Sequence, residues 1–205
     1  AIAARGKFVC AISGGSIIEM LRAGLYNVAE RGADIDTDKW HFFFVDERCV
    51  PLDHDDSNHK AASPWSTTPP ENVHTINPDL SPADAAADYL TKVKAVLGDT
   101  PVFDLVLLGM GPDGHTASLF PGHPLLDEKT ALIAPITDSP KPPASRITFT
   151  YPLIQAARKA FVVAAGASKR VAFAKVHHHR TLPDPTLPLV RLQMDNHEPV
   201  VWFVD

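Results

Sequence analysis

The sequence predicts an α/β protein with a doubly wound, mostly parallel sheet and helices on both faces, a Rossmann-like arrangement. Short apolar runs of strand length recur along the chain, and segments with helical periodicity follow most of them. Strands that alternate with helices in this way favour a parallel sheet covered on both faces. Four of the runs end in short polar or glycine-rich motifs. The length of 205 residues suits one domain, which we place at residues 1–205.

The expected strands are the apolar runs, and the expected helices lie between them. Strands are predicted at residues 7–12, 40–45, 102–108, 131–134, 146–150, 160–165 and 200–204. Helices are predicted from residue 17 onward, at 82–97, at 151–159 and, opened by the turn at 166–169, through residue 176. Ser81 and Pro82 mark the start of the second helix and Gly98 its end. Ser57 or Asn58 is expected to cap a further short helix.

The stretch from residue 101 to 121 organises the chain. Its apolar part, 102–108, is typical of a strand buried on both faces, and three glycines with a proline among them then predict a tight loop. The loop carries Asp113 and His115, and a helix is predicted to start at Thr116 to Phe120. A carboxylate and an imidazole at such a turn suit an anionic substrate.

Three other polar motifs follow predicted strands. Residues 13–16 read Ser-Gly-Gly-Ser, residues 46–48 read Asp-Glu-Arg, and residues 166–169 read Gly-Ala-Ser-Lys. These motifs also have ordinary explanations: a bare turn at 13–16, a solvated strand end at 46–48, and one exposed lysine at 166–169. Because the carboxyl ends of parallel strands meet at one edge, we expect the motifs to gather around one ligand. Glycines before a helix, with a lysine nearby, favour a phosphate.

Composition excludes several classes of protein. The net charge of −5 and the lack of a broad basic block argue against nucleic acid, and no apolar run approaches the roughly 20 residues of a membrane span. Two cysteines without metal-ligand spacing, Cys10 and Cys49, and the lack of a signal-peptide pattern lead us to expect a cytoplasmic protein with reduced thiols. We expect a monomer or a weak dimer.

We expect neither a metal nor a cofactor. The acidic run at 53–56 lacks calcium-loop spacing, and the three histidines at 177–179 are interpreted as a solvated helix end. The glycines of 109–114 match the bare Gly-x-Gly-x-x-Gly pattern, but His115 and the phosphate-type loops argue against a dinucleotide.

Residues 109–121, Gly-Met-Gly-Pro-Asp-Gly-His-Thr-Ala-Ser-Leu-Phe-Pro, closely resemble the central motif of the 6-phosphogluconolactonases, which are grouped with the glucosamine-6-phosphate deaminases. Asp-Glu-Arg-Cys-Val-Pro at 46–51 resembles the family's second motif, and 13–16 its first phosphate loop. The resemblance covers almost the whole chain and implies a NagB-type fold. The family usually has a strand and helix ahead of residue 7 and a helix after the last strand, and we expect both to be lacking here.

The resemblance implies hydrolysis of 6-phospho-D-glucono-1,5-lactone to 6-phospho-D-gluconate in the oxidative pentose phosphate pathway. The catalytic candidates are four side chains: His115 as general base, Asp113, Arg48 and Asp46. The phosphate candidates are Ser13, Gly14, Gly15, Ser16, Lys169 and, more weakly, Arg146. One alternative is a deaminase–isomerase, although those enzymes carry an apolar residue and then Asn-Glu-Pro after the histidine. The other is a non-catalytic sugar-phosphate sensor.

Overall fold

A computed structural model describes residues 1–31, 36–63, 68–177 and 184–205. Five parallel strands form a central sheet in the order β2-β1-β4-β7-β8. The strands are β1 (Phe8–Ile12), β2 (Trp40–Phe44), β4 (Leu105–Gly109), β7 (Ala160–Ala164) and β8 (Val201–Val204). All five lie where apolar runs predict them, so the parallel α/β core is confirmed.

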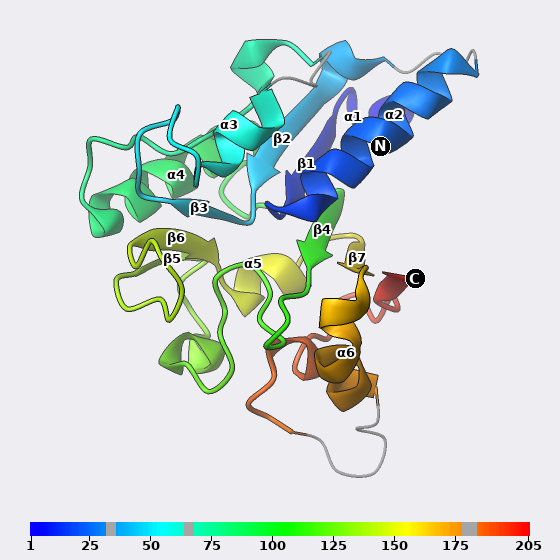
Figure 1. The fold of residues 1–205 in the computed structure, drawn as a ribbon. Helices are drawn as coiled ribbons and strands as arrows, with labels where there is room; N and C mark the ends of the chain where they lie inside the picture. The colour runs from blue at the N-terminus through cyan, green and yellow to red at the C-terminus, as the bar shows by residue number, and fades with distance from the viewer. Residues whose placement is uncertain (32–35, 64–67, 178–183) are drawn as a thin grey trace.

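One helix precedes β1, and the other described helices lie between strands (Figure 1). They are α1 (Ile2–Arg5), α2 (Ser16–Glu30), α3 (Asn58–Ala62), α4 (Pro82–Leu97), α5 (Tyr151–Gln155) and α6 (Arg170–His177). Single 3-10 turns also occur: η1 (Thr37–Lys39), η3 (Pro70–Asn72), η4 (Pro124–Asp127), η5 (Ala167–Lys169) and η7 (Pro188–Val190). No helix in the described ranges is both long and apolar enough to cross a bilayer.

The helix caps follow the sequence signals. Ser81 Oγ accepts a hydrogen bond from the backbone N–H of Asp84 at the start of α4, and Gly98 follows its last residue. Ser57 caps α3 by accepting from the N–H of Lys60. Both caps were predicted from side chains that satisfy N–H groups left free in a first turn. α5 is shorter than predicted, ending at Gln155.

A second, three-stranded sheet was not predicted. It pairs β3 (Asp46–Arg48), β6 (Arg146–Phe149) and β5 (Ile133–Ile136), all antiparallel. Figure 1 shows this sheet on the opposite side of the view from α6, with β4 between them. The charged run at 46–48 is therefore a strand rather than a loop after one, because its backbone pairs with β6.

Val45 joins the two sheets. Its backbone N–H donates to the carbonyl of Ile12 in β1 (3.0 Å), and its carbonyl accepts from the N–H of Phe149 in β6 (2.7 Å). The side chain is fully buried. Val45 is thus hydrogen-bonded to both sheets, and it fixes the position of β3 relative to the carboxyl end of β1.

The predicted helix start at Thr116–Phe120 is wrong. Thr116 and Leu119 instead close a tight turn with reciprocal backbone hydrogen bonds of 3.2 and 2.9 Å, and Ala117 has a φ of 49°. Tertiary contacts hold this turn: the Thr116 hydroxyl donates to the carbonyl of Gly109, and the N–H of Ser118 donates to Thr148 Oγ1. The positive φ of Ala117 and the bond from the Thr116 N–H to the Leu119 carbonyl are incompatible with an α-helix.

The strand order shows at which point along the edge of the central sheet a ligand is expected to bind. After β1 the chain moves to β2 on one side, whereas β4 lies on the other side of β1 and leads on to β7. This reversal is a topological switch point, where open α/β sheets bind ligands at the carboxyl ends of their strands. The loops after β1 and β4 lie on either side of it.

Candidate active site

The predicted motifs meet in one pocket at the switch point. It is lined from β1 by Ser13 to Ser16, from β4 by Gly109 to Gly111 and His115, and from η5 by Lys169. Asp46 and Arg48 reach it from β3. Eight of the ten predicted site residues therefore line this pocket, and a ninth, Asp113, is hydrogen-bonded to His115. Arg146 does not line the pocket.

The loop after β1 is shaped for close approach. A Cβ built on Gly14 would lie 1.9 Å from Oδ1 of Asn58, so only glycine fits against that side chain. Gly15 has a φ of +72°, in the region that favours glycine. Ser13 Oγ accepts from the N–H of Gly109 (2.9 Å), which ties this loop to β4. The N-terminus of α2 begins at Ser16, where the helix dipole favours an anion.

His115 and Asp113 form a hydrogen-bonded pair. His115 Nδ1 lies 2.5 Å from Oδ1 of Asp113, so the imidazole donates its Nδ1 proton to the carboxylate. Nε2 makes no hydrogen bond within the ranges that the structure describes and is the nitrogen left to accept a proton. Phe120 packs beside the imidazole, with ring centroids 4.9 Å apart. A histidine oriented by a carboxylate is the arrangement of a general base.

Charge and burial act on both members of the pair. Burial lowers the pKa of His115 from its ordinary value, against the effect of Asp113, which raises it. Burial alone would raise the pKa of Asp113, but hydrogen bonds from His115 and Lys141 and their charges lower it to about 2. At neutral pH the pair is therefore an aspartate beside a neutral imidazole, the form that accepts a proton.

Asp46 lies at the centre of a buried polar cluster. Its side chain is 5% exposed, and Oδ2 accepts from the hydroxyl of Ser118 (2.8 Å). The same oxygen lies 4.0 Å from Nε of Arg48 and 3.9 Å from Nη1 of Arg146. Two guanidinium groups thus offset the cost of burying the carboxylate.

Arg48 lines the pocket with a side chain that is 24% exposed. Its Nη1 donates to the carbonyl of Asp56 (2.9 Å), while its buried Nε has no hydrogen-bond partner among the described residues. Arg146 differs, because its guanidinium donates to the carbonyls of Lys141, Pro142 and Pro143. The structure thus places Arg146 beneath a loop beside the pocket instead of facing the pocket as a phosphate ligand would.

Glu47 holds the strand and α3 together. Its buried carboxylate accepts from the backbone N–H groups of Arg48, Asn58 and His59, each at 2.8 Å. Burial raises its pKa to about 7, although these hydrogen bonds favour the charged form. Asn58, held in this way, donates to the carbonyl of Asp46 and packs against Gly14. The middle acid of Asp-Glu-Arg therefore supports the site from behind.

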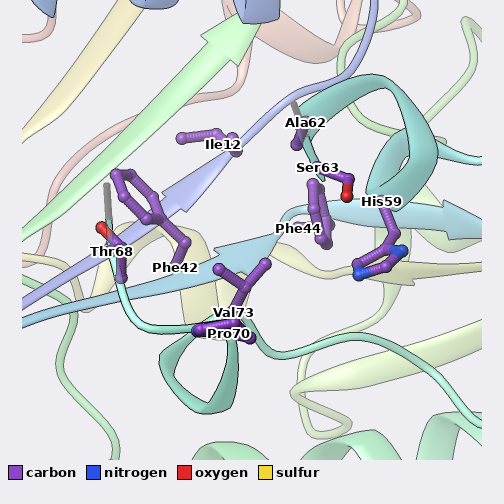
Figure 2. Close-up of a pocket in the computed structure, with 9 residues that line it drawn as sticks. All are labelled: Ile12, Phe42, Phe44, His59, Ala62, Ser63, Thr68, Pro70 and Val73. Carbon is purple, nitrogen blue, oxygen red and sulfur yellow. The ribbon is translucent and has the colours of Figure 1, made fainter. Parts of the chain in front are cut away.

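A second pocket lies on the other side of β1. It is formed by Ile12, Phe42 and Phe44 of the sheet, by α3 and by the segment around Val73 (Figure 2). The described residues that line it include no lysine or arginine, and most of them are apolar. Such a surface does not suit an anionic ligand, whereas the pocket of His115 is lined by polar groups and by Lys169. Across the described ranges, no group of three or more His, Cys, Asp or Glu side chains is placed to hold a metal ion.

Comparison with known proteins decides the family. A family model described as glucosamine-6-phosphate isomerases/6-phosphogluconolactonase matches residues 1–202. The chain belongs to this family. The 6-phosphogluconolactonases of rat and human are 41% and 40% identical to it, over 98% of this chain and 79% and 80% of theirs. A probable chloroplastic 6-phosphogluconolactonase of rice is 40% identical, and this chain spans 66% of its length.

Solved structures of the family share the fold. The 6-phosphogluconolactonase of Thermotoga maritima superposes with a TM-score of 0.81 at 27% identity, covering 99% of this chain and 87% of that one. The enzyme of Trypanosoma brucei gives 0.72 at 27% identity, covering 97% and 83%. The doubly wound prediction is thus confirmed by observed topology and by the family's structures.

Some residues at the candidate site were not predicted. Lys141 Nζ lies 3.1 Å from Asp113 Oδ1 and 3.1 Å from His115 Nδ1, although 26 residues separate it from the histidine. Ser118 and Asn58 were likewise not assigned to the site. The one signal for Lys141 was a lone cation among the prolines of residues 140–143. His178 and His179, in the predicted solvated helix end, lie outside the described residues.

Proposed function

We propose that this protein hydrolyses 6-phospho-D-glucono-1,5-lactone to 6-phospho-D-gluconate, with His115 as general base. One observation carries the proposal: the His115–Asp113 pair borders the same pocket as a glycine loop, a helix N-terminus and Lys169. A proton acceptor and a phosphate site within one pocket suit a phosphorylated substrate that water attacks. The names of the rat and human relatives support the same reaction.

The chemistry needs a positioned water and a base. A lactone is an activated ester, so water attacks C1 once a proton can leave it. Nε2 of His115 takes this proton as the bond from oxygen to C1 forms, and Asp113 steadies the imidazolium through Nδ1. The imidazolium then returns a proton to the ring oxygen as the bond from C1 to that oxygen breaks. The acid product loses its proton to water.

The cluster on β3 faces the developing charge. Negative charge builds on the carbonyl oxygen in the tetrahedral intermediate, and Arg48 lines the pocket with a positively charged guanidinium that can offset it. Asp46 is held by Ser118 and is suited to accept hydrogen bonds from sugar hydroxyls. We assign Arg48 to the carbonyl oxygen because the phosphate has its own site across the pocket.

The phosphate site is formed by Ser13 to Ser16 and Lys169. The glycines allow backbone N–H groups to approach the phosphate closely, and α2 directs its positive dipole end toward it. Lys169 enters from η5, and burial lowers its pKa from the ordinary value, with Lys141 acting in the same sense. Arg146 is left out of this site because its guanidinium is bonded to backbone carbonyls.

The experiment must distinguish lactone hydrolysis from two rival functions. A deaminase–isomerase would need the Glu of the Asn-Glu-Pro turn after the histidine, where this chain has Thr-Ala-Ser-Leu-Phe-Pro. Asp46 is the only carboxylate among the described residues that line the pocket. A non-catalytic sensor would need the phosphate loops but not the His115–Asp113 pair.

The test is a lactonase assay with the purified protein. The lactone is generated from glucose 6-phosphate by a dehydrogenase, and its loss is followed above spontaneous hydrolysis. We expect His115→Gln to lower kcat by about 10²–10⁴-fold and to leave 6-phosphogluconate affinity nearly unchanged. Wild-type turnover equal to background would contradict the proposal, and release of ammonia from glucosamine 6-phosphate would favour the deaminase.

We further expect the reaction to proceed without a metal, in the cytoplasm, with the protein as a monomer or weak dimer. Full activity after dialysis against a chelator would support the first point, and loss that one metal restores would refute it. Light scattering at assay concentration would test the oligomeric state. The rice relatives are named chloroplastic, so location must be tested by microscopy of the tagged full-length protein.

A further inference from the structure

We propose that Lys141 is a positioning residue that keeps the His115–Asp113 pair in the form of a neutral imidazole beside an ionised carboxylate. The inference rests on the proposed function, because it concerns the base of that reaction. It starts from the contacts of one ammonium group with both members of the pair, 3.1 Å from each.

The loop that carries Lys141 is fixed on both sides. The hydroxyl of Ser139 donates to the carbonyl of Lys141 (2.8 Å) and accepts from its N–H (3.2 Å). Arg146 donates from Nη2 to the carbonyls of Lys141 and Pro142, and from Nε to that of Pro143. Arg146 is itself only 3% exposed, with its guanidinium over the ring of Phe120. The hydrogen bonds of this buried arginine thus hold the loop in place, and the loop directs Lys141 toward His115 and Asp113.

The ammonium and the imidazole share one acceptor. Lys141 Nζ and His115 Nδ1 both contact Oδ1 of Asp113. Without Lys141, the carboxylate of Asp113 would stabilise the protonated imidazole fully, and the pair would more often be an imidazolium beside an aspartate. Lys141 supplies a positive charge at the same oxygen, so a second positive charge on His115 is disfavoured. The imidazole then keeps Nε2 unprotonated near neutral pH.

All charged groups around His115 enter this balance. Asp113 lies on its own loop, Lys141 comes from the loop before β6, and Asp46 comes from β3. Burial lowers the pKa of His115, Lys141 lowers it further, and the two aspartates raise it. Removing Lys141 must therefore raise the pKa of His115.

A direct role in binding substrate fits Lys141 less well. Lys141 does not line the pocket, whereas Lys169 does. Its side chain is 38% exposed, and its described polar contacts are those with Asp113 and His115. The phosphate loops lie at the pocket lining after β1 and β7, and Lys141 belongs to neither.

The experiment compares Lys141→Met with Lys141→Arg. The rate of lactone hydrolysis is measured against pH for both variants and for wild type. We expect the acid limb of the Lys141→Met profile to move to higher pH, with kcat within a few-fold of wild type well above the limb. Lys141→Arg keeps the charge and should restore the wild-type limb. Asp113→Asn removes a negative charge and should move any residual limb the opposite way.

A second readout does not depend on activity. The imidazole signals of the ligand-free protein are titrated by NMR, and His115→Gln identifies the signal of His115. Its midpoint should rise in Lys141→Met and return in Lys141→Arg. An unchanged midpoint, or a raised KM with an unmoved acid limb, would overturn the inference. If wild type shows no lactonase activity, the proposed function fails, and the NMR titration still decides whether Lys141 controls the imidazole.

Discussion

Gly111→Ala should remove most activity although it replaces no catalytic side chain. A Cβ built on Gly111 would lie 2.0 Å from Nδ1 and 2.1 Å from Cε1 of His115, and 2.6 Å from Oδ1 of Asp113. Ordinary contact begins at 3.4 Å, so the imidazole must retreat by about 1.4 Å. A misplacement of ~1 Å in a catalytic group costs about 10²-fold in rate. We therefore expect kcat to fall by roughly 10²-fold.

The assay is lactone hydrolysis together with calorimetric binding of 6-phosphogluconate. Binding should change little, because the phosphate loops lie across the pocket. Gly24→Ala is the matched control: Gly24 is exposed in α2, has no atom within 4 Å of its added Cβ, and gains helix propensity of up to about 1 kcal/mol. The reasoning is refuted if folded Gly111→Ala hydrolyses the lactone within threefold of wild type.

Three further changes test the phosphate site and the buried ionisable groups. Lys169→Ala should weaken 6-phosphogluconate binding by up to about 1.5–3 kcal/mol in calorimetry, yet leave hydrolysis of unphosphorylated gluconolactone unchanged; equal loss on both substrates would argue against a phosphate contact. Glu47→Gln should lower the urea-derived free energy of unfolding by about 1–3 kcal/mol, because a neutral amide cannot accept all three N–H bonds, whereas exposed Glu71→Gln should be neutral. Burial lowers the pKa of His74 from 6.5 to about 4, so the unfolded chain takes up this proton first and stability falls as pH drops from 6.5 to 4. The raised pKa of Glu47 changes stability in the opposite sense between pH 4.5 and 7. The effect of the histidine is therefore taken as the difference in unfolding free energy between wild type and His74→Gln. If this difference stays constant from pH 4 to 6.5, the assignment is refuted.

The parallel core could be predicted because its signals are local. Apolar runs such as 102–108 and caps such as Ser81 specify strands and a helix start without reference to the rest of the chain. The family motif then identified the loops after β1, β4 and β7. Once strands alternate with helices, topology alone gathers such loops at one edge.

The missed features depend on tertiary contacts. Thr116 to Phe120 has helix-compatible residues, but hydrogen bonds to Gly109 and Thr148 hold a turn there instead. Lys141 reaches His115 from a loop distant in sequence, which Ser139 and Arg146 hold in place. Arg146 was expected near the phosphate, since a sequence pattern cannot tell a ligand cation from one that binds backbone carbonyls. The short antiparallel sheet was missed because β3 is a charged run of three residues.

The hydrogen bonds of Val45 have a consequence for how substrate is admitted. Val45 is bonded to β1 on one side and β6 on the other, so the halves of the pocket that carry Ser13 and Asp46 share one continuous backbone network. A hinge between the sheets would have to break these bonds. We therefore expect the part of the pocket between Ser13 and Asp46 to be preformed, without closure of one sheet onto the other. For a substrate that also decays in water, capture then depends on diffusion to an open site, and the overall dimensions in solution should not change when 6-phosphogluconate binds.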